Sequence, residues 1–412
     1  MKNAFLQGQK INRTVYLEPP KDYKKEGKIW RLNKCVYGLD DAARSWFLEV
    51  EKDLKAMGCI QSKVDICVFF FYQADNLCGI VFLHVDDFLH MGDMVFEEKV
   101  IRKIREKYRI GKSEDGSFIY TGLNINEVPE GIKIDQLQYI PEISTVSIPN
   151  GPGVCKDDIV PSESKSSLRR TVGQANWAAR RTRPDVGFDL MELSMRFNNA
   201  TVSDLRRAKK VVDRLNMEEV VILFPRLSPT KLSIRTYSDA SFANLIDGVS
   251  SGRGHVIFLV DENDQSAPLH WTSNKVKRVV NSTLAAEALA LQEAIDCAIY
   301  LRELLREMHN KPFLRLPIES WVDNNNAFDA VHLTTQVSDT KLRIDIADIK
   351  ESMRDSDVTV KWCPGDEMIA NSLTKRGANS DSLLHLLNGG SIECRHFKDG
   401  LATGWINFRK IL

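Results

Sequence analysis

The chain has 412 residues, which is long for one ordinary domain and favours two or three. Hydrophobic residues make up 43% of it and charged residues 27%, the composition of a soluble globular protein. The formal net charge is zero, so the overall charge identifies no nucleic-acid partner. A surface that binds nucleic acid has to come from local clusters of basic residues.

The cysteines and the apolar segments exclude several classes of protein. No apolar run is long enough to span a bilayer, and the first residues lack the pattern of a signal peptide. The cysteines form no CxxC pair and no run with zinc-ligand spacing, which predicts reduced thiols. We therefore expect an intracellular protein with no membrane partner. The eight cysteines are Cys35, Cys59, Cys67, Cys78, Cys155, Cys297, Cys363 and Cys394.

The first part of the chain mixes strands and helices. Its clearest helix is expected near Ala42–Met57, where Trp46, Phe47, Val50 and Leu54 recur at helical spacing and predict a buried face. Asn150-Gly-Pro-Gly is a typical loop sequence, and we expect a domain boundary just after it. The other expected elements are strands over 14–18, 28–32, 66–72, 118–125 and 131–135, a hairpin over 77–91 and a helix over 96–108.

The middle part, residues 165–214, is helical in pattern and basic, with twelve Lys and Arg against five Asp and Glu. These side chains could line a track for phosphates, with Trp177 stacking on a base. They could equally form a solvated helix face, with Trp177 in the core. The candidate nucleic-acid-binding residues are Arg180, Arg181, Arg183, Arg206, Arg207, Lys209 and Lys210.

In the last part, the order of elements predicts a compact mixed α/β domain. Three strands are followed by a long helix, a strand, two helices, a strand and a short helix. The expected ranges are strands 232–238, 255–260 and 268–273, helix 283–308, strand 318–322, helices 325–332 and 341–352, strand 358–362 and helix 368–375.

Four acidic or amide residues lie at the ends of these elements. Asp239 and Asp323 end strands, Glu287 lies near the start of the long helix, and Asn371 begins the last helix. Such positions can converge on one side of a sheet, where oxygen ligands would bind Mg²⁺ and support displacement at phosphorus. Each residue alone is also an ordinary turn or capping residue, so the set and its order make the prediction.

Two adjacent carboxylates, Asp86 and Asp87, lie between two apolar strands and predict a hairpin tip. Their mutual repulsion favours a divalent cation nearby. The alternative is a turn in which both carboxylates are simply solvated.

The motifs of the last part resemble the RNase H domain in the Pol polyprotein of copia-type LTR retrotransposons. They read Tyr237-Ser-Asp-Ala, Ser282-Thr-Leu-Ala-Ala-Glu, Trp321-Val-Asp-Asn and Ile369-Ala-Asn-Ser-Leu-Thr-Lys. The resemblance implies that Asp239, Glu287 and Asp323 are catalytic ligands of Mg²⁺ or Mn²⁺. The family has Asp where this chain has Asn371, so the resemblance implies a weakened fourth metal ligand.

Earlier motifs resemble the reverse transcriptase of the same family. His84-Val-Asp-Asp is similar to its Tyr/Phe-Val-Asp-Asp box, which implies that Asp86 and Asp87 are catalytic metal ligands. The family has a further Asp directly before the segment that resembles Met1-Lys-Asn-Ala-Phe-Leu, so we expect an N-terminally truncated reverse transcriptase that does not polymerise. Only a full-length parent would then bind dNTP. Further matches are Val15-Tyr-Leu-Glu-Pro-Pro, Val36-Tyr-Gly-Leu-Asp-Asp-Ala-Ala-Arg-Ser-Trp and Thr182-Arg-Pro-Asp-Val-Gly-Phe, and the resemblance covers residues 1 to about 378.

We therefore expect a mixed α/β (α+β) multidomain protein. The expected parts are a partial reverse-transcriptase palm and thumb over residues 1–155, a basic helical thumb or connection over 156–228, an RNase H-like mixed-sheet domain over 229–378 and a tail over 379–412.

The resemblance implies an RNA-directed DNA polymerase and a ribonuclease H that degrades RNA in RNA–DNA hybrids by two-metal chemistry. The expected partners are RNA–DNA hybrid, RNA template and DNA, and the expected location is the cytoplasm, in a virus-like particle when the element is intact, or the nucleus. One alternative is a decayed or co-opted remnant that binds nucleic acid without turnover. Another is a fragment that does not fold by itself.

Overall fold

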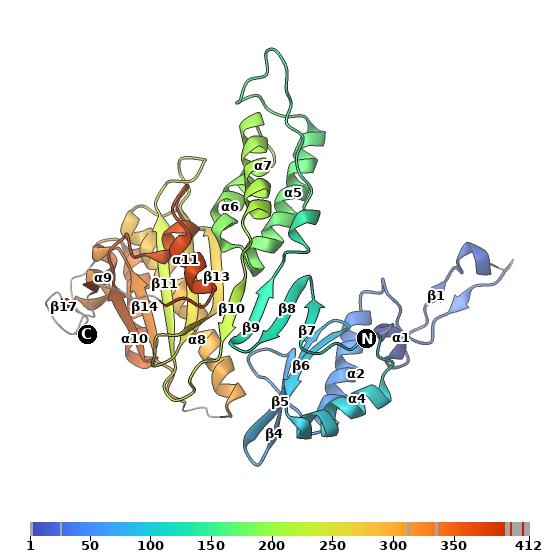
Figure 1. Cartoon of the computed structure of the whole chain (residues 1–412). Helices are drawn as coiled ribbons and strands as arrows, with labels where there is room; N and C mark the ends of the chain where they lie inside the picture. Colours follow the sequence, from blue (N-terminus) through green and yellow to red (C-terminus); the bar gives the residue numbers. More distant parts are fainter. Residues whose placement is uncertain are drawn as a thin grey trace. The chain divides into compact units, whose positions relative to one another are not determined.

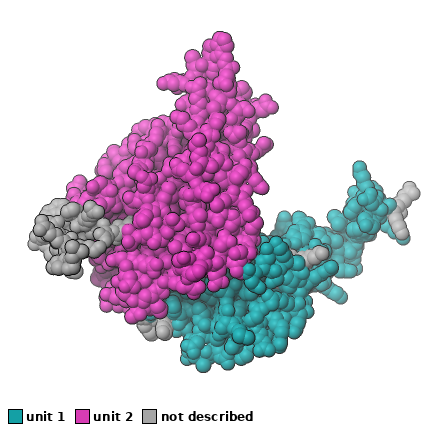
Figure 2. Space-filling view, in the orientation of Figure 1, with its two compact units in different colours: residues 1–115, 303–314 teal, residues 116–302, 315–412 magenta. Residues whose placement is uncertain are grey.

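The computed structural model describes residues 3–24, 27–310, 314–333 and 337–391, and the backbone alone of residues 396–397 and 406–407. The chain divides into two compact units (Figure 1; Figure 2). Unit 1 comprises residues 1–115 and 303–314, and unit 2 comprises residues 116–302 and 315–412. Among the described residues, no helix is long and apolar enough to cross a membrane.

Unit 1 contains short helices, a two-stranded ribbon and a four-stranded antiparallel sheet. Its elements are α1 (Ala4–Gln7), β1 (Tyr16–Leu17), the 3₁₀ helix η1 (Lys21–Tyr23), β2 (Trp30–Arg31), α2 (Ala42–Ala56), β3 (Ile60–Gln61), β4 (Val68–Gln73), β5 (Asn76–His84), β6 (Asp87–Gly92), α3 (Met94–Phe96), the π-helical turn η2 (Glu97–Ile101) and α4 (Arg102–Lys107). The sheet has the order β3–β4–β5–β6, and β1 pairs with β2.

The sheet of unit 1 is buried on both faces along β4, which explains the unbroken apolar sequence of that strand. On one face, Trp46 and Leu54 of α2 pack with Phe69 and Phe96 in the larger core. Phe96 lies so close to Gly79 that an added Cβ there would be 2.2 Å from its ring. The expected helix over 42–57 with a buried Trp46 is confirmed.

Unit 2 contains a second four-stranded sheet, a helical bundle and a five-stranded mixed sheet with its helices. Its elements are β7 (Ser117–Tyr120), β8 (Leu123–Val128), β9 (Gly131–Asp135), η3 (Ile140–Glu142), α5 (Ser162–Arg181), η4 (Pro184–Val186), α6 (Gly187–Met195), α7 (Val202–Met217), β10 (Ile222–Pro225), β11 (Ser233–Ser241), β12 (Gly252–Val260), β13 (Ser266–Lys275), α8 (Thr283–Met308, of which 283–302 lie in this unit), β14 (Ile318–Val322), α9 (Asn325–His332), α10 (Thr340–Asp355), β15 (Val358–Trp362), the 3₁₀ helix η5 (Ile369–Leu373), α11 (Asp381–Leu387), β16 (His396–Phe397) and β17 (Ile406–Asn407).

Helices α5, α6 and α7 form the bundle, which stands out in green in Figure 1. Its core is made of small and branched apolar side chains, among them Leu168, Leu193 and Leu205, which are fully buried. Helix α7 begins with a capping box in which Thr201 and Asp204 satisfy each other's backbone N–H groups. The helical prediction for residues 165–214 is confirmed.

The five-stranded sheet has the order β13–β12–β11–β14–β15. Strands β11, β12 and β13 are antiparallel, whereas β11, β14 and β15 are parallel to one another. Helix α8 presents a stripe of alanines at a spacing of four residues, and the absence of larger side chains along it lets the helix pack closely. The stripe consists of Ala286, Ala290, Ala294 and Ala298, all buried.

The observed packing differs from the expected domain boundaries at two places. The units separate between Asp115 and Gly116, well before the expected boundary after residue 155, because β9 pairs with β10 and joins 116–135 to unit 2. Helix α11, which follows the expected domain end at residue 378, buries Leu383 and Leu387 in the same core as residues of the five-stranded sheet. The part of the expected tail over 392–412 lies outside the described side chains, and so does Cys394.

Candidate active site

Asp239, Glu287 and Asp323 come together at one end of the five-stranded sheet. Strands β11 and β14 run parallel, and Tyr237 pairs with Trp321, so the residues two positions further along each strand reach the same edge. Glu287 comes from the first turns of α8. Oxygen atoms of the three carboxylates all lie within 4.8 Å of one another. The convergence that the sequence predicted for these three acids is confirmed.

Burial makes this group of carboxylates costly without a positive charge. Asp239 is fully buried and Glu287 is 4% exposed, and Oε2 of Glu287 is a buried atom with no hydrogen-bond partner among the described residues. Desolvation raises the pKa of Asp239, and desolvation together with the charges of Asp239 and Asp323 raises that of Glu287. Desolvation and the charge of Asp239 raise the pKa of Asp323 to about 6. Three crowded carboxylates with an unpartnered oxygen are a donor set that fits a divalent cation.

Lys375, in the segment that follows η5, places a positive charge next to the three carboxylates. Lys375 Nζ lies 3.2 Å from Asp239 Oδ1 and 3.9 Å from Asp323 Oδ2. Lys375 also donates to the amide oxygen of Asn371, and Thr374 donates a hydrogen bond to Asp239. Asn371 was predicted to be a weakened fourth metal ligand. It contacts the carboxylates indirectly, through Lys375.

The close approach of η5 to the sheet depends on Gly254 in β12. A Cβ at that position would lie 2.6 Å from Cβ of Leu373 and 3.1 Å from Cγ2 of Thr374. A cleft of about 300 Å³ opens beside η5, and Asn371 and Lys375 are among the residues that line it. Sequence reasoning missed the roles of Thr374 and Lys375. The signal was present, because both follow Asn371 within the same Leu-Thr-Lys motif.

Asp86 and Asp87 lie in unit 1, at the tight turn between β5 and β6. Val85 has a φ of 56°, which is unfavourable for a β-branched residue, and its carbonyl oxygen accepts a hydrogen bond of 2.9 Å from Trp46 Nε1. Tyr37 donates to Asp86 Oδ2 at 3.2 Å. The predicted hairpin tip is confirmed. Within the described residues, neither aspartate belongs to a group of three metal-binding side chains.

Among the exposed members of the predicted basic track are Arg180, Arg181, Arg206 and Lys210. The guanidinium group of Arg181 lies 4.6 Å from the ring centre of the half-buried Trp177. Their exposure is compatible with both readings of this region, the phosphate track and the solvated helix face. Lys209 is exposed as well, but it is paired with Asp213 at 2.8 Å on the same helix.

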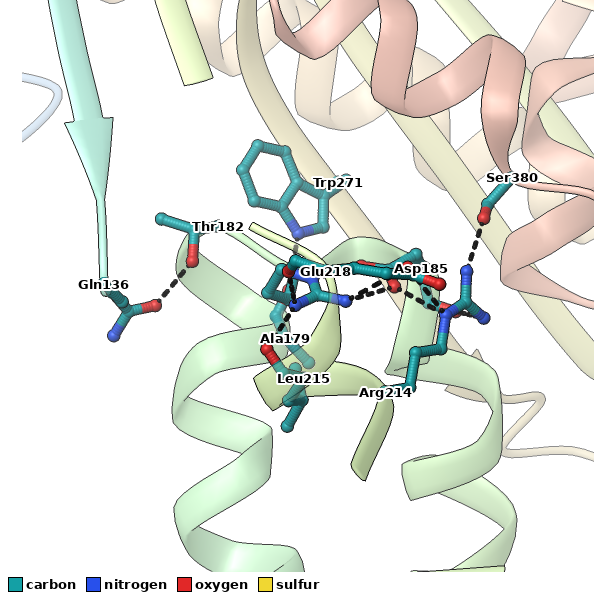
Figure 3. Close-up of polar contacts among 10 residues, drawn as sticks. Gln136, Ala179, Thr182, Asp185, Arg214, Leu215, Glu218, Trp271 and Ser380 are labelled. Atoms are coloured by element: carbon teal, nitrogen blue, oxygen red, sulfur yellow. Dashed lines mark hydrogen bonds and ion pairs between the residues drawn. The ribbon is translucent and has the colours of Figure 1, made fainter. Parts of the chain in front are cut away.

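Arg183 does not belong to this surface, and its prediction as a nucleic-acid-binding residue is corrected. Its side chain is fully buried and forms two hydrogen bonds of 2.9 Å with Asp185. It also donates to the carbonyl oxygens of Leu215 (3.0 Å) and Glu218 (2.8 Å) at the end of α7. Figure 3 shows these partners together with Asp185. The Thr-Arg-Pro-Asp motif is thus a packed corner that joins the ends of α5 and α7.

Arg207 is also largely withdrawn from solvent. It donates to Asp189 Oδ1 at 2.9 Å and to the buried Glu192 Oε2 at 2.8 Å. Glu192 accepts two further hydrogen bonds from Arg376, the residue that follows Lys375. The position of Arg207 therefore indicates a role in fixing α6 and the segment after η5, in place of the predicted contact with nucleic acid.

The amino-acid sequence matches known proteins in both units. The profile of the family described as reverse transcriptase (RNA-dependent DNA polymerase) matches residues 1–148. The Pol polyprotein from transposon RE2 of Arabidopsis thaliana is 26% identical over 322 residues, which are 75% of this chain and 22% of that protein. The Pol polyprotein from transposon TNT 1-94 of Nicotiana tabacum is 25% identical over 407 residues, 91% of this chain and 29% of that protein.

The chain is similar in sequence to the Pol polyproteins of copia-type retrotransposons. It spans about a fifth of the length of the RE1 and RE2 polyproteins. A yeast relative, the putative transposon Ty5-1 protein of Saccharomyces cerevisiae, is 26% identical over 67% of this chain and 92% of its own length. The mixed α/β fold that the sequence predicted is confirmed in the described residues.

Two solved structures are similar over different extents of this Pol-related chain. The RNase H1 named LC11, isolated from compost, covers 34% of this chain and 92% of its own at 18% identity, with a TM-score of 0.27. The protease–reverse transcriptase of Prototype Foamy Virus covers 94% of this chain and 68% of its own at 12% identity, with a TM-score of 0.24.

Proposed function

We propose that unit 2 hydrolyses the RNA strand of RNA–DNA hybrids, and that Asp239, Glu287 and Asp323 hold the Mg²⁺ or Mn²⁺ that the reaction needs. The observation that carries the proposal is the convergence of three carboxylates within 4.8 Å, with one buried oxygen unpartnered. Such a group is stable near neutral pH only when a positive charge offsets the repulsion. The motif order and the relationship to Pol polyproteins support the choice of substrate.

The residues of the chain have distinct parts in this reaction. A bound divalent cation supplies an activated water molecule and stabilises negative charge on the phosphate. Thr374 and Lys375 hold Asp239 from one side, so that the carboxylate stays oriented when the cleft is occupied. The exposed Arg180, Arg181 and Arg206 are suited to phosphate contacts along the backbone of the hybrid.

We infer that the described residues of unit 1 do not catalyse polymerisation by themselves. Asp86 and Asp87 provide two adjacent carboxylates, whereas two-metal nucleotidyl transfer needs a further ligand to bridge the ions. The strained turn and the hydrogen bond from Trp46 hold the two aspartates in a fixed hairpin. This geometry is suited to nucleotidyl transfer once a third carboxylate is supplied.

The experiment is a cleavage assay with the purified chain and a hybrid labelled on its RNA strand. In Mg²⁺ or Mn²⁺ the wild type should cut the RNA, and Asp239→Asn should lower the rate by at least about a hundredfold, as loss of a metal ligand does. Asp329→Asn is the matched control, because it removes the same charge from an exposed position on α9. Intact hybrid in every reaction would refute hydrolysis by this chain.

A second function, binding of nucleic acid without turnover, is favoured by one feature of the site. Asn371 contributes no negative charge, and Lys375 lies among the carboxylates where a cation would bind. Hybrid binding that weakens steeply with salt, together with no cleavage, would support this function over the first.

A further inference from the structure

A second group of potential metal ligands lies in unit 2, and its chemistry differs from that of the carboxylates. It consists of His255 in β12, His270 in β13 and Cys297 in α8. One ligand atom from each residue lies within 4.8 Å of the other two. Two imidazoles and a thiol are the donors that Zn²⁺ and related transition-metal cations prefer, whereas Mg²⁺ prefers oxygen.

The strand register explains why two of these side chains meet. Ile257 pairs with His270, and His255 lies two residues before Ile257, so both histidines point to the same face of the sheet. Their ring centres are 5.3 Å apart. Helix α8 covers this face, as the ion pair of 2.7 Å between Arg253 and Glu293 shows, and Cys297 lies one turn beyond Glu293.

His255 is the member of the group that ordinary packing explains least. It is 2% exposed, and its Nε2 atom is buried with no hydrogen-bond partner among the described residues. A buried polar nitrogen normally has a partner, because burial removes its hydrogen bonds to water. Its neighbours in this group are a second imidazole and a thiol, and a metal ion between the three would provide that partner.

The access and the spacing are also suited to a metal. His270 is exposed and Cys297 is half-buried, so the group opens to solvent on one side. Neighbouring donors in a tetrahedral zinc site lie about 3.3–3.8 Å apart, as follows from bond lengths of about 2.0–2.3 Å. Donors within 4.8 Å reach that spacing by small side-chain rotations.

We propose that His255, His270 and Cys297 form a binding site for Zn²⁺ or a similar thiophilic transition-metal cation, with a solvent molecule as the fourth ligand. As the sulfur–metal bond forms, Cys297 releases its thiol proton to solvent, and the neutral imidazoles donate lone pairs. The bound metal ties the edge strand β13 to α8 and β12. The site is separate from the carboxylate group and does not depend on hydrolysis.

The test uses Co²⁺ as a spectroscopic probe on the full-length chain under reducing conditions. In wild type, one equivalent of Co²⁺ should saturate a near-ultraviolet thiolate-to-cobalt charge-transfer band, and Zn²⁺ should abolish the band by displacing Co²⁺ from the thiolate. Cys297→Ser should lose the band, and His270→Gln should weaken Co²⁺ binding by at least about tenfold. His270 is exposed, so its replacement leaves the core intact.

Two control variants separate this site from other ligands. Cys155→Ser changes an exposed cysteine outside the group and should keep the band. Asp239→Asn should keep it too, because the carboxylates provide no sulfur ligand. The absence of a band in wild type would overturn the proposal, and so would a band that survives in Cys297→Ser.

Discussion

The ammonium group of Lys375 lies 3.2 Å from Oδ1 of the fully buried Asp239. Asp239 also accepts a hydrogen bond from Thr374, so both of its oxygens are held by consecutive residues of one segment. Lys375 extends toward Asp323 as well, at 3.9 Å. An internal cation thus partly neutralises the group of acids, and any divalent cation has to displace it or share its ligands.

Removal of this internal cation should strengthen the binding of divalent cations. Lys375→Met deletes the competing charge, and we expect the Kd for Mn²⁺ to fall on the order of tenfold. Isothermal titration calorimetry without nucleic acid measures it. Lys341→Met removes an exposed lysine from α10 and should leave the Kd unchanged. An unchanged or weaker affinity in Lys375→Met would mean that the lysine and the cation do not compete.

The amide at position 371 should limit cation affinity. Asn371→Asp adds a negative charge next to Lys375, so we expect it to tighten Mg²⁺ binding about tenfold and to speed RNA cleavage at low Mg²⁺. Asn326→Asp, an exposed change on α9, serves as the control. Equal cleavage by Asn371→Asp and wild type across the Mg²⁺ titration would show that this position lies outside the cation site.

The stability of the metal-free chain should depend on the protonation of Asp323. Burial and the charge of Asp239 raise its pKa to about 6. A carboxyl group with a raised folded-state pKa contributes stability that is fully present below its unfolded pKa, near 3.9, and is lost as the pH rises through the folded pKa. As the pH rises from about 4 to about 6, the free energy of unfolding of the wild type should fall by roughly 3 kcal/mol relative to that of Asp323→Asn.

Urea unfolding in EDTA at several pH values measures this difference. Saturating Mg²⁺ should restore stability to the wild type above pH 6, because the cation binds the ionised carboxylates of the folded state. If the difference between wild type and Asp323→Asn stays constant across this range, Asp323 does not titrate with a raised pKa.

Arg183 and Arg180 should respond to substitution in opposite ways. Arg183→Met removes one of the two arginines paired with the buried Asp185, together with the donor to the carbonyl oxygens of Leu215 and Glu218, and should lower the free energy of unfolding by about 3–5 kcal/mol. Arg180→Met changes an exposed side chain and should leave stability within about 0.5 kcal/mol. Chemical denaturation gives both values. A stable Arg183→Met variant would contradict the structural role of the buried ion pair.

The same pair of variants separates packing from nucleic-acid binding. Arg180→Met should weaken hybrid binding and reduce its salt dependence if this surface contacts phosphates. Unchanged hybrid affinity at low salt in Arg180→Met would remove that residue from the proposed track.

Local periodicity was sufficient to predict much of the last domain. The bounds expected for α8, β14, α9 and β15 coincide with those observed, because each element has a clear helical or strand pattern between turn residues. The three carboxylates were predictable for the same reason, since each lies at the end or start of such an element. The role of Lys375 was missed, because a lysine after a short helix is usually a solvated residue, although its place in the Leu-Thr-Lys motif was a signal.

Features that depend on pairing between distant segments were not predictable. The pairing of β9 with β10 moves residues 116–135 into unit 2, and no local pattern indicates it. Arg183 was predicted to be exposed because basic residues surround it, although Asp185 two positions later was a signal for a buried pair. The His255, His270 and Cys297 group comes from three separate elements, so it has no motif spacing. The predicted intracellular location stays a prediction.

The central claim is that Asp239, Glu287 and Asp323 form a divalent-cation site. Mn²⁺ binding to the nucleic-acid-free chain, followed by electron paramagnetic resonance of the unbound ion, tests it most directly. We predict that wild type, Asp329→Asn and Cys297→Ser bind Mn²⁺ equally. Glu287→Gln removes the charge of the carboxylate whose buried Oε2 has no hydrogen-bond partner among the described residues, and it should weaken binding at least about tenfold. Equal binding by Glu287→Gln and wild type would contradict the claim.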